Sequence, residues 1–281
     1  MGRDPLDINQ NYFDKESKSM YYVLGAFYGN GLIITASYTK KNGVNQVYRG
    51  LKYCTNCRAL MDIITAELNL SVSVTEDKRP GHNSFWFQQF GVDNLCERLE
   101  ALGLGLPKDE RTFPEIDEKY LSHFVRGYFD AKGTVQDNEG RTSIIIWGYP
   151  SFLIGLNLAL WRYAGIIQEG KTNRKLRFNY PDSIKLYNFM YQDWECISKN
   201  GIYLPSNKDA FNLNYRPRDR CDELRKQRMG RIKRAKELLL ESKPVGDVAT
   251  ELGYKNPESL SASFRKATGM SPRDYIKSHA K

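Results

Sequence analysis

Two cysteines, Cys54 and Cys57, have the spacing that lets neighbouring thiolates share one metal ion. A structural zinc site needs two further ligands, and no second cysteine pair or histidine pair follows at the spacing of a zinc finger. We therefore expect ordinary half-buried thiols, no bound metal and no cofactor. The total of five cysteines is odd, and the polar start MGRDPLDINQ carries no secretory signal, so we expect a reducing, cytoplasmic compartment.

Basic side chains are the second group with chemical potential, because they bind polyanions. The 281-residue chain has a formal net charge of +9, and most of it lies in the tail. From Arg216 onward, 17 Lys and Arg stand against 9 Asp and Glu, which leaves a net charge of +1 for everything before. This excess predicts nucleic acid as the partner, although a solvated basic face is also compatible with it.

A repeated stretch predicts how the first 200 residues are organised. The sequence VLGAFYGNG at Val23 to Gly31 returns as VRGYFDAKG at Val125 to Gly133, 102 residues later. Small residues four apart on a helix let two backbones approach closely. We therefore expect two motif helices packed on each other as the seam between two similar halves.

The elements around each copy follow the same order. In the first half, residues 1–102, hydrophobic periodicity and an Asn-Gly turn predict helices at 19–29, 56–68 and 92–102 and strands at 32–40, 46–55, 71–75 and 84–90. After a Gly- and Pro-rich linker at 103–116, the second half, 117–198, repeats it with helices at 117–131, 150–164 and 183–194 and strands at 134–137, 142–148, 166–171 and 175–180. The fold class is α+β, with two αββαββα halves and antiparallel sheets.

The tail reads as a separate small all-α domain at 223–281, behind an interdomain linker at 199–222. Residues 225–240 place Ile232, Ala235, Leu238 and Leu239 on one helical stripe, and Arg231, Lys233 and Arg234 off it, where they could contact phosphates. A short helix closed by Gly253, a turn at 254–256 and a second helix begun by Pro257 predict a helix-turn-helix.

The two repeated stretches resemble the paired LAGLIDADG motifs of single-chain homing endonucleases. This resemblance implies that each half lays an antiparallel sheet into the DNA major groove, which admits a β-ribbon whose outward side chains reach base edges. The polar candidates for these contacts are Thr35, Ser37, Thr39, Gln46, Tyr48 and Lys52 in the first half and Gln136, Arg141, Ser143, Lys171, Arg174, Lys175 and Arg177 in the second. Any single one of them could equally belong to a solvated strand face.

The chain departs from that family where the chemistry lies. The resemblance implies an acidic residue at the eighth position of each motif, where two carboxylates hold the divalent ions that activate water. Asn30 and Lys132 occupy these positions, and an ammonium group repels a metal ion. Asp130 lies about 200° around the helix from Lys132, so we expect it to pack at the seam. We predict that the chain is not an enzyme.

The tail resembles the C-terminal helix-turn-helix half of AraC-type transcriptional regulators through RIKRAKELL, VATELGY, SFRKATGMSP and Tyr275. One helix-turn-helix unit is evident, and Ala262 stands where that family often has arginine. By docking geometry, the first turn of the second helix meets base edges and later residues hold phosphates. The base-edge candidates are Asn256, Glu258, Ser259 and Ala262, and the phosphate candidates are Arg265 and Lys266.

These observations favour a sequence-specific double-stranded DNA-binding protein, a transcriptional regulator built from an inactive homing-endonuclease fold and a helix-turn-helix. It would bind DNA as a monomer, associate with the nucleoid and have RNA polymerase as a second partner, without a membrane. Two alternatives stay open. One is a homing endonuclease with an altered metal site, and the other is an RNA-binding splicing helper, or maturase.

Overall fold

The computed structural model describes residues 8–40, 42–78, 84–138, 141–168, 173–213 and 217–279, with the side chains of these residues except 138, 141 and 217–226. The chain divides into two units, Met1–Leu213 and Asn214–Lys281, each with its own apolar core. In the described part of the chain, no helix is both long enough and apolar enough to cross a membrane.

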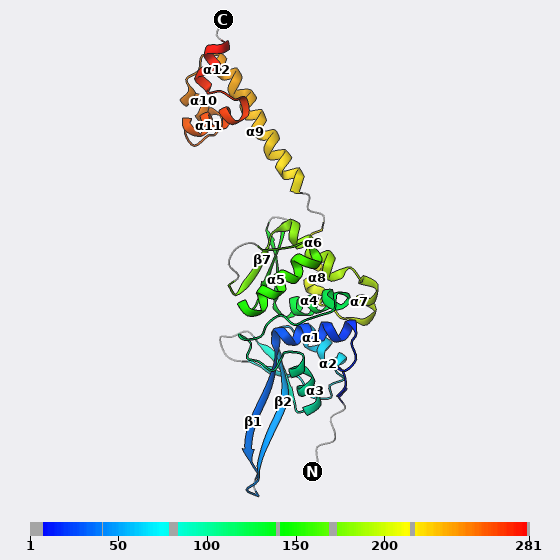
Figure 1. Cartoon of the computed structure of the whole chain (residues 1–281). Helices are drawn as coiled ribbons and strands as arrows, with labels where there is room; N and C mark the ends of the chain where they lie inside the picture. The colour runs from blue at the N-terminus through cyan, green and yellow to red at the C-terminus, as the bar shows by residue number, and fades with distance from the viewer. Residues whose placement is uncertain are drawn as a thin grey trace. The chain divides into compact units, whose positions relative to one another are not determined.

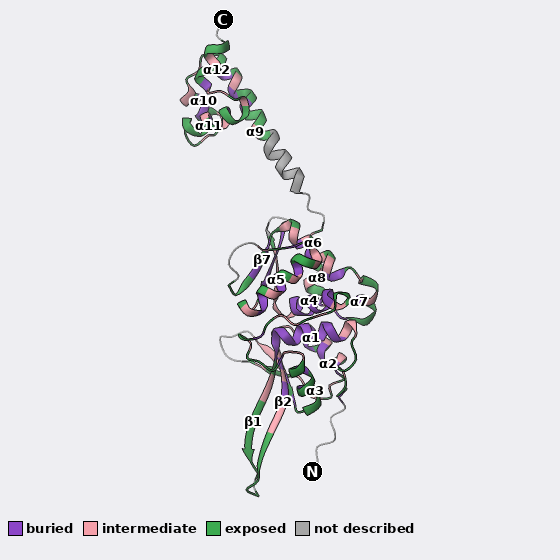
Figure 2. Ribbon diagram, in the orientation of Figure 1, coloured by how far each residue is buried: buried purple, intermediate pink, exposed green. Residues whose placement is uncertain are grey.

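The first unit is built around α1 (Lys18–Asn30) and α4 (Glu118–Lys132), which lie side by side at its centre (Figure 1). Both helices are buried along most of their length, as the purple ribbon in Figure 2 shows. Their backbones meet at two glycines. A Cβ atom on Gly25 would overlap the carbonyl oxygen of Phe124, and one on Gly127 would overlap that of Tyr22. The repeated small residues therefore form the predicted seam.

The first sheet follows α1 directly. Its strands are β1 (Gly31–Thr39), β2 (Asn45–Thr55), β3 (Thr75–Asp77) and β4 (Phe85–Phe90), and they run antiparallel in the order β1-β2-β4-β3. The β1–β2 hairpin extends beyond the rest of this unit (Figure 1), and its outer part is exposed on both faces. The helices α2 (Arg58–Glu67) and α3 (Asp93–Ala101) complete the half.

The second half repeats this plan with a smaller sheet in the described residues. The strands β5 (Gly133–Asn138), β6 (Arg141–Trp147) and β7 (Lys175–Phe178) pair antiparallel in that order. Helices α5 (Pro150–Ala164), α6 (Tyr180–Tyr191), α7 (Trp194–Asn200) and α8 (Pro205–Asp209) accompany it. The predicted α+β class with antiparallel sheets is confirmed.

Two predicted strands are wrong in their described parts. Residues 166–168 form no strand, because Gly165 ends α5 in the left-handed conformation and the side chain of Asn157 hydrogen-bonds both the N–H and the carbonyl of Gln168, at 2.9 and 3.0 Å. Residues 71–74 form none either. There the amide of Gln88 donates to the carbonyl of Val72 at 2.6 Å, in place of a neighbouring strand. The rest of the first prediction, 169–171, lies outside the described residues.

The predicted interdomain linker at 199–222 is also wrong over most of its length. Ile202, Leu204 and Phe211 are buried in the core of the first unit. The N–H of Leu204 and the side-chain amide of Asn207 donate to the carboxylate of Asp130 at 2.9 and 3.0 Å. Residues 199–213 therefore belong to the first unit, because buried backbone donors in this segment find their acceptors there. The predicted helix 183–194 is two helices, α6 and α7, and begins at Tyr180.

The second unit is all-α. It contains α9 (Pro217–Leu240), α10 (Val245–Glu251), α11 (Pro257–Thr268) and α12 (Pro272–His279). The helix predicted to begin at 225 thus begins eight residues earlier. The buried side chains of its core come from three helices: Ile232, Ala235, Leu238, Leu239, Val248, Ala249, Leu260 and Phe264.

Candidate nucleic-acid interface

The α10–turn–α11 segment presents one face to solvent. Gly253 adopts φ +71° in the turn, and the side chain of Asn256 caps α11 by accepting from the N–H of Ser259 at 2.9 Å. Leu260 and Phe264 point into the core, which fixes the opposite face of α11 outward. The six predicted contact residues are all exposed: Asn256, Glu258, Ser259, Ala262, Arg265 and Lys266.

Two of the predicted base readers bind each other. The hydroxyl of Ser259 donates to Oδ1 of Asn256 at 2.6 Å, the same oxygen that caps the helix. The side-chain oxygen of Asn256 and the hydroxyl hydrogen of Ser259 are thus engaged within the protein. The other two predicted base readers in the first turns of α11 are Glu258 and Ala262, and their side chains make no hydrogen bond among the described residues.

A groove of about 870 Å³ runs along this face. It is lined by the start of α10, the outer side of α11 and the start of α12. Arg265 and Arg273 both line it, together with Glu258 and Ala262. Arg273 is not among the contact residues predicted from the sequence, because its place in this lining depends on how α12 packs.

The basic residues of α9 differ from one another in their surroundings. Arg231, Lys233 and Arg234 are all exposed. Arg234 forms an ion pair with Glu237 at 3.0 Å, and the guanidinium of Arg231 lies 5.4 Å from the ring centre of Tyr254. Lys233 has no ion pair among the described residues, so it is the best placed of the three to hold a phosphate.

The second sheet gathers several predicted residues on one face. Antiparallel pairing sets Gln136 opposite Ser143, and Arg177 opposite Ile145, so these side chains share the face that Lys175 and Trp147 also occupy. The guanidinium of Arg177 donates to the side chain of Gln136 at 3.4 Å, which agrees with this register. Ser143 is buried, however, and cannot reach a base edge.

Three predicted residues of this half lie apart from that face or outside the description. Arg174 is exposed just before β7, with its guanidinium 4.6 Å from the ring centre of Tyr149. Arg141 takes the β6 position that pairs with Asn138, and its side chain is not among those described. Lys171 lies outside the described residues.

The first-sheet candidates fall on two faces, so they cannot all meet one DNA groove. The register pairs Ser37 with Val47 and Thr35 with Arg49, whose side chain forms ion pairs with Glu97 and Glu100 of α3. Thr35, Ser37 and Thr39 therefore lie on the helix side of the hairpin. Gln46, Tyr48 and Lys52 lie on the other side, where Lys52 sits 4.8 Å from the ring centre of Phe87.

The ends of the two motif helices border a cavity of about 600 Å³. Asn30 is nearly buried and donates to the carbonyl of Ala131 at 3.4 Å. Lys132 is half-buried, and its desolvation lowers the pKa of its ammonium group. Neither side chain supplies an anionic oxygen to a metal ion.

Asp130 also borders this cavity, but its carboxylate is fully engaged. It accepts hydrogen bonds from the hydroxyl of Tyr22 at 2.8 Å, the N–H of Leu204 and the amide of Asn207. Burial raises its pKa to about 6, and these hydrogen bonds oppose the rise. Asp130 thus packs at the seam, as its helical position predicts.

The thiols of Cys54 and Cys57 line the same cavity. Burial raises the pKa of the Cys54 thiol, which opposes the thiolate form that metals bind. Over the part of the chain that the structure describes, no three His, Cys, Asp or Glu side chains come together in a cluster that could hold a metal ion.

Comparison with known proteins bears on both units. Residues 225–278 match the family model described as a helix-turn-helix domain. These residues form a helix-turn-helix. They include α10, α11 and α12 and the greater part of α9, and the prediction made from the tail sequence is confirmed.

The chain is similar in backbone arrangement to solved homing endonucleases. I-WcaI bound to its DNA recognition sequence is 13% identical over 76% of this chain and 96% of its own, with a TM-score of 0.48. I-GzeII, a LAGLIDADG enzyme in complex with its DNA target, is 11% identical over 66% and 89%, with a TM-score of 0.43. I-LtrWI bound to target DNA is 12% identical over 74% of this chain and 100% of its own, with a TM-score of 0.42. No curated protein matches the chain.

Proposed function

We propose that this protein binds double-stranded DNA at specific sequences and regulates transcription, with the helix-turn-helix as its principal reader. The observation that carries the proposal is the exposed outer face of α11, held outward by the buried Leu260 and Phe264 within residues that match a helix-turn-helix family. A recognition helix set this way enters the major groove with its first turns at the base edges.

The proposed contacts divide by chemistry. Glu258 can accept a hydrogen bond from the amino group of cytosine, and the methyl of Ala262 can pack on a thymine methyl. Arg265, Lys266 and Arg273 surround this part of the helix with positive charge and would hold phosphates. The network of Asn256 and Ser259 would keep the helix start rigid rather than read a base.

The second sheet offers an additional surface for the same DNA molecule. Gln136, Lys175 and Arg177 share one face of a twisted antiparallel sheet, and such a surface can lie in a major groove. A monomer with two reading units would cover a long site, with RNA polymerase as a partner of the regulator. We propose no cleavage by the first unit, because Asn30 and Lys132 stand at the helix ends and both carboxylate oxygens of Asp130 already accept hydrogen bonds within the protein.

The test begins with a duplex selected from random sequences by the full chain. We expect Arg265→Ala and Lys266→Ala each to weaken binding by roughly 1 kcal/mol and to reduce the slope of log affinity against log salt by roughly one. Lys243→Ala is the matched control, because Lys243 is already paired with Glu251 at 2.9 Å and should release no counterion. An unchanged slope in both variants would refute this docking of α11.

Two further outcomes separate the alternatives. The same duplex is incubated with Mg²⁺ and with Mn²⁺, and specific cleavage would replace the regulator by a nuclease with a displaced metal site. Structured RNA is then tested as a competitor. If RNA binds as tightly as the selected duplex or more tightly, the chain is better described as an RNA-binding splicing helper.

A further inference from the structure

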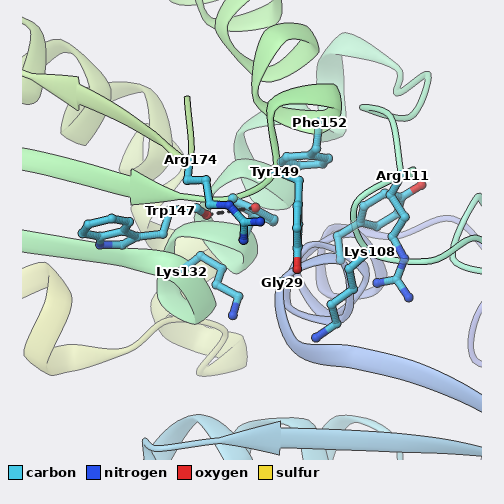
Figure 3. A pocket seen from close by; sticks show the side chains of 11 residues that line it. Gly29, Lys108, Arg111, Lys132, Trp147, Tyr149, Phe152 and Arg174 are labelled. Carbon is cyan, nitrogen blue, oxygen red and sulfur yellow. Dashed lines mark hydrogen bonds between the residues drawn. The ribbon is translucent and has the colours of Figure 1, made fainter. Parts of the chain in front are cut away.

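A pocket in the first unit lies beside the motif helices and is lined by segments from both halves. Its volume is about 360 Å³, within the range of small-molecule sites. Its walls come from the ends of α1 and α4, the segment that connects the two halves, and the turn between β6 and α5. Figure 3 shows Lys132 and Arg174 on one side of this pocket and Lys108 and Arg111 on the other.

The charged residues of the lining are all cationic. Lys108, Arg111, Lys132 and Arg174 contribute, and no Asp or Glu lines the pocket. None of the four has a carboxylate within ion-pair distance among the described residues. Arg111 is buried and donates to the carbonyls of Leu106 and Gly31 at 2.9 and 3.1 Å, so its positive charge is not neutralised.

This concentration of charge is unfavourable without an anion. Burial, together with the nearby charges of Lys132 and Arg111, lowers the pKa of Lys108 to about 8. Four cations around one cavity repel one another, and a bound anion would relieve the repulsion and keep the lysines protonated. A dianion is favoured over a monoanion, and a phosphate monoester has about −1.5 to −2 charges and three acceptor oxygens at neutral pH.

The remaining wall is aromatic. Tyr128 and Phe152 stack with ring centres 4.3 Å apart, and the hydroxyl of Tyr128 donates to the carbonyl of Trp147 at 3.0 Å. Tyr149 lies beneath Arg174, and Trp147 remains 45% exposed. Tyr128 and Phe152 are themselves buried, so the more exposed rings of Trp147 and Tyr149 are the ones on which a second flat ring can stack.

We propose that this pocket binds a free nucleoside monophosphate, with the phosphate among the four cations and the base against the aromatic wall. The two chemistries of the lining match the two parts of this ligand, and its size suits the cavity. The inference goes beyond the proposed DNA binding, because it concerns a soluble ligand in the other unit of the chain.

The test is titration calorimetry of the full chain with AMP, GMP, CMP and UMP. We expect at least one to bind about tenfold more tightly than inorganic phosphate and than its own uncharged nucleoside, since each half would lack one set of contacts. Arg174→Gln and Lys108→Gln should each weaken binding about tenfold. Arg162→Gln, an equal change of charge on the exposed side of α5, should leave it unchanged. The tryptophan fluorescence of each variant checks its folding.

The pH profile gives a second measurement. Lys108 faces Lys132, Arg111 and the Cys54 thiol, and it must be protonated to hold a phosphate. Affinity should therefore fall between about pH 7 and pH 9, and this fall should be smaller in Lys108→Gln. The proposal is overturned if none of the four nucleotides binds, or if Arg162→Gln weakens binding as much as Arg174→Gln. It is also overturned if the pocket variants weaken only DNA binding, because the cations then hold a DNA phosphate.

Discussion

Asp130 and His123 are both buried on α4, and they change the stability of the fold in opposite directions as the pH rises. Burial raises the pKa of Asp130 to about 6, so the folded state keeps a proton that the unfolded chain releases near pH 4. Stability from Asp130 is therefore lost as pH rises from about 4 to 6. Burial and the guanidinium of Arg126 lower the pKa of His123 to about 4, so stability from His123 is lost as pH falls from about 6.5 to 4.

Replacing Asp130 with a side chain that does not titrate should reveal its contribution to the pH dependence of stability. In Asp130→Asn, the free energy of unfolding relative to the natural protein should rise by up to about 3 kcal/mol between pH 4 and pH 7, since each pKa unit is worth about 1.4 kcal/mol. Urea unfolding followed by tryptophan fluorescence at a series of pH values measures this difference. His123→Gln should shift with the opposite sign. Two curves parallel to that of the natural protein would show that neither pKa is perturbed by folding.

Site residues were predictable where one helix decides their direction. The stripe of Leu260 and Phe264 sets the exposed side of α11, and all six of its predicted contact residues are exposed. Lys108 and Arg111 could not be found this way, because they lie in a connecting segment and meet Lys132 and Arg174 only through the packing of the two halves. Along each strand of the first hairpin the polar candidates occupy alternate positions, as expected for one exposed face. The pairing register of the two strands, however, places Ser37 and Gln46 on opposite faces of the sheet.

At the scale of elements, the seam between α1 and α4 depends on two glycines that have no room for a side chain. The atoms facing them are backbone atoms: the carbonyl of Phe124 and the N–H of Tyr128 face Gly25, and the carbonyl of Tyr22 faces Gly127. Backbone atoms in the middle of a helix cannot move aside alone, so an added methyl group must separate the helices. The separation would loosen the packing of both halves.

Gly25→Ala and Gly127→Ala should therefore each destabilise the first unit by about 2 to 3 kcal/mol, the cost of overpacking a tight core. All four tryptophans, Trp86, Trp147, Trp161 and Trp194, lie in this unit, so tryptophan fluorescence in urea reports on it alone. Gly230→Ala in α9 should leave this midpoint unchanged, because Gly230 lies in the other unit and has open space around it. A lowered midpoint in all three variants would argue against a steric cause at the seam.

Helices proved easier to predict than short strands. The bounds of α5 agree with its prediction, because Pro150 and Gly165 mark its two ends. The apolar run at 166–168 looks like a strand, but Ile166 is buried by the end of α5 and Asn157 satisfies the backbone of Gln168. A side chain distant in sequence decides that outcome, and local pattern cannot reveal it. Likewise, Asp130 draws Leu204 and Asn207 into the core although their sequence reads as a linker.

At the scale of the whole molecule, the two cores share no residue, and their sizes differ greatly. The core of the helix-turn-helix unit consists of a few buried side chains, so each of them supplies a large share of its stability. The principal DNA reader and the nucleotide pocket are assigned to different units. The two activities should consequently fail separately when one core is damaged.

Phe264→Ala tests this separation in the full chain. Phe264 is completely buried in the core of this unit, and the centre of its ring lies 5.3 Å from that of Tyr275. Its truncation should cost about 3 to 5 kcal/mol, enough to unfold a small unit. We expect binding to the selected duplex to be lost, while the tryptophan-monitored urea midpoint and the affinity for the nucleoside monophosphate stay unchanged. Leu153→Ala, in the core of the first unit, should instead lower the urea midpoint. If Phe264→Ala also lowers that midpoint, the two units fold as one cooperative body, and the assignment of separate roles to them would have to be abandoned.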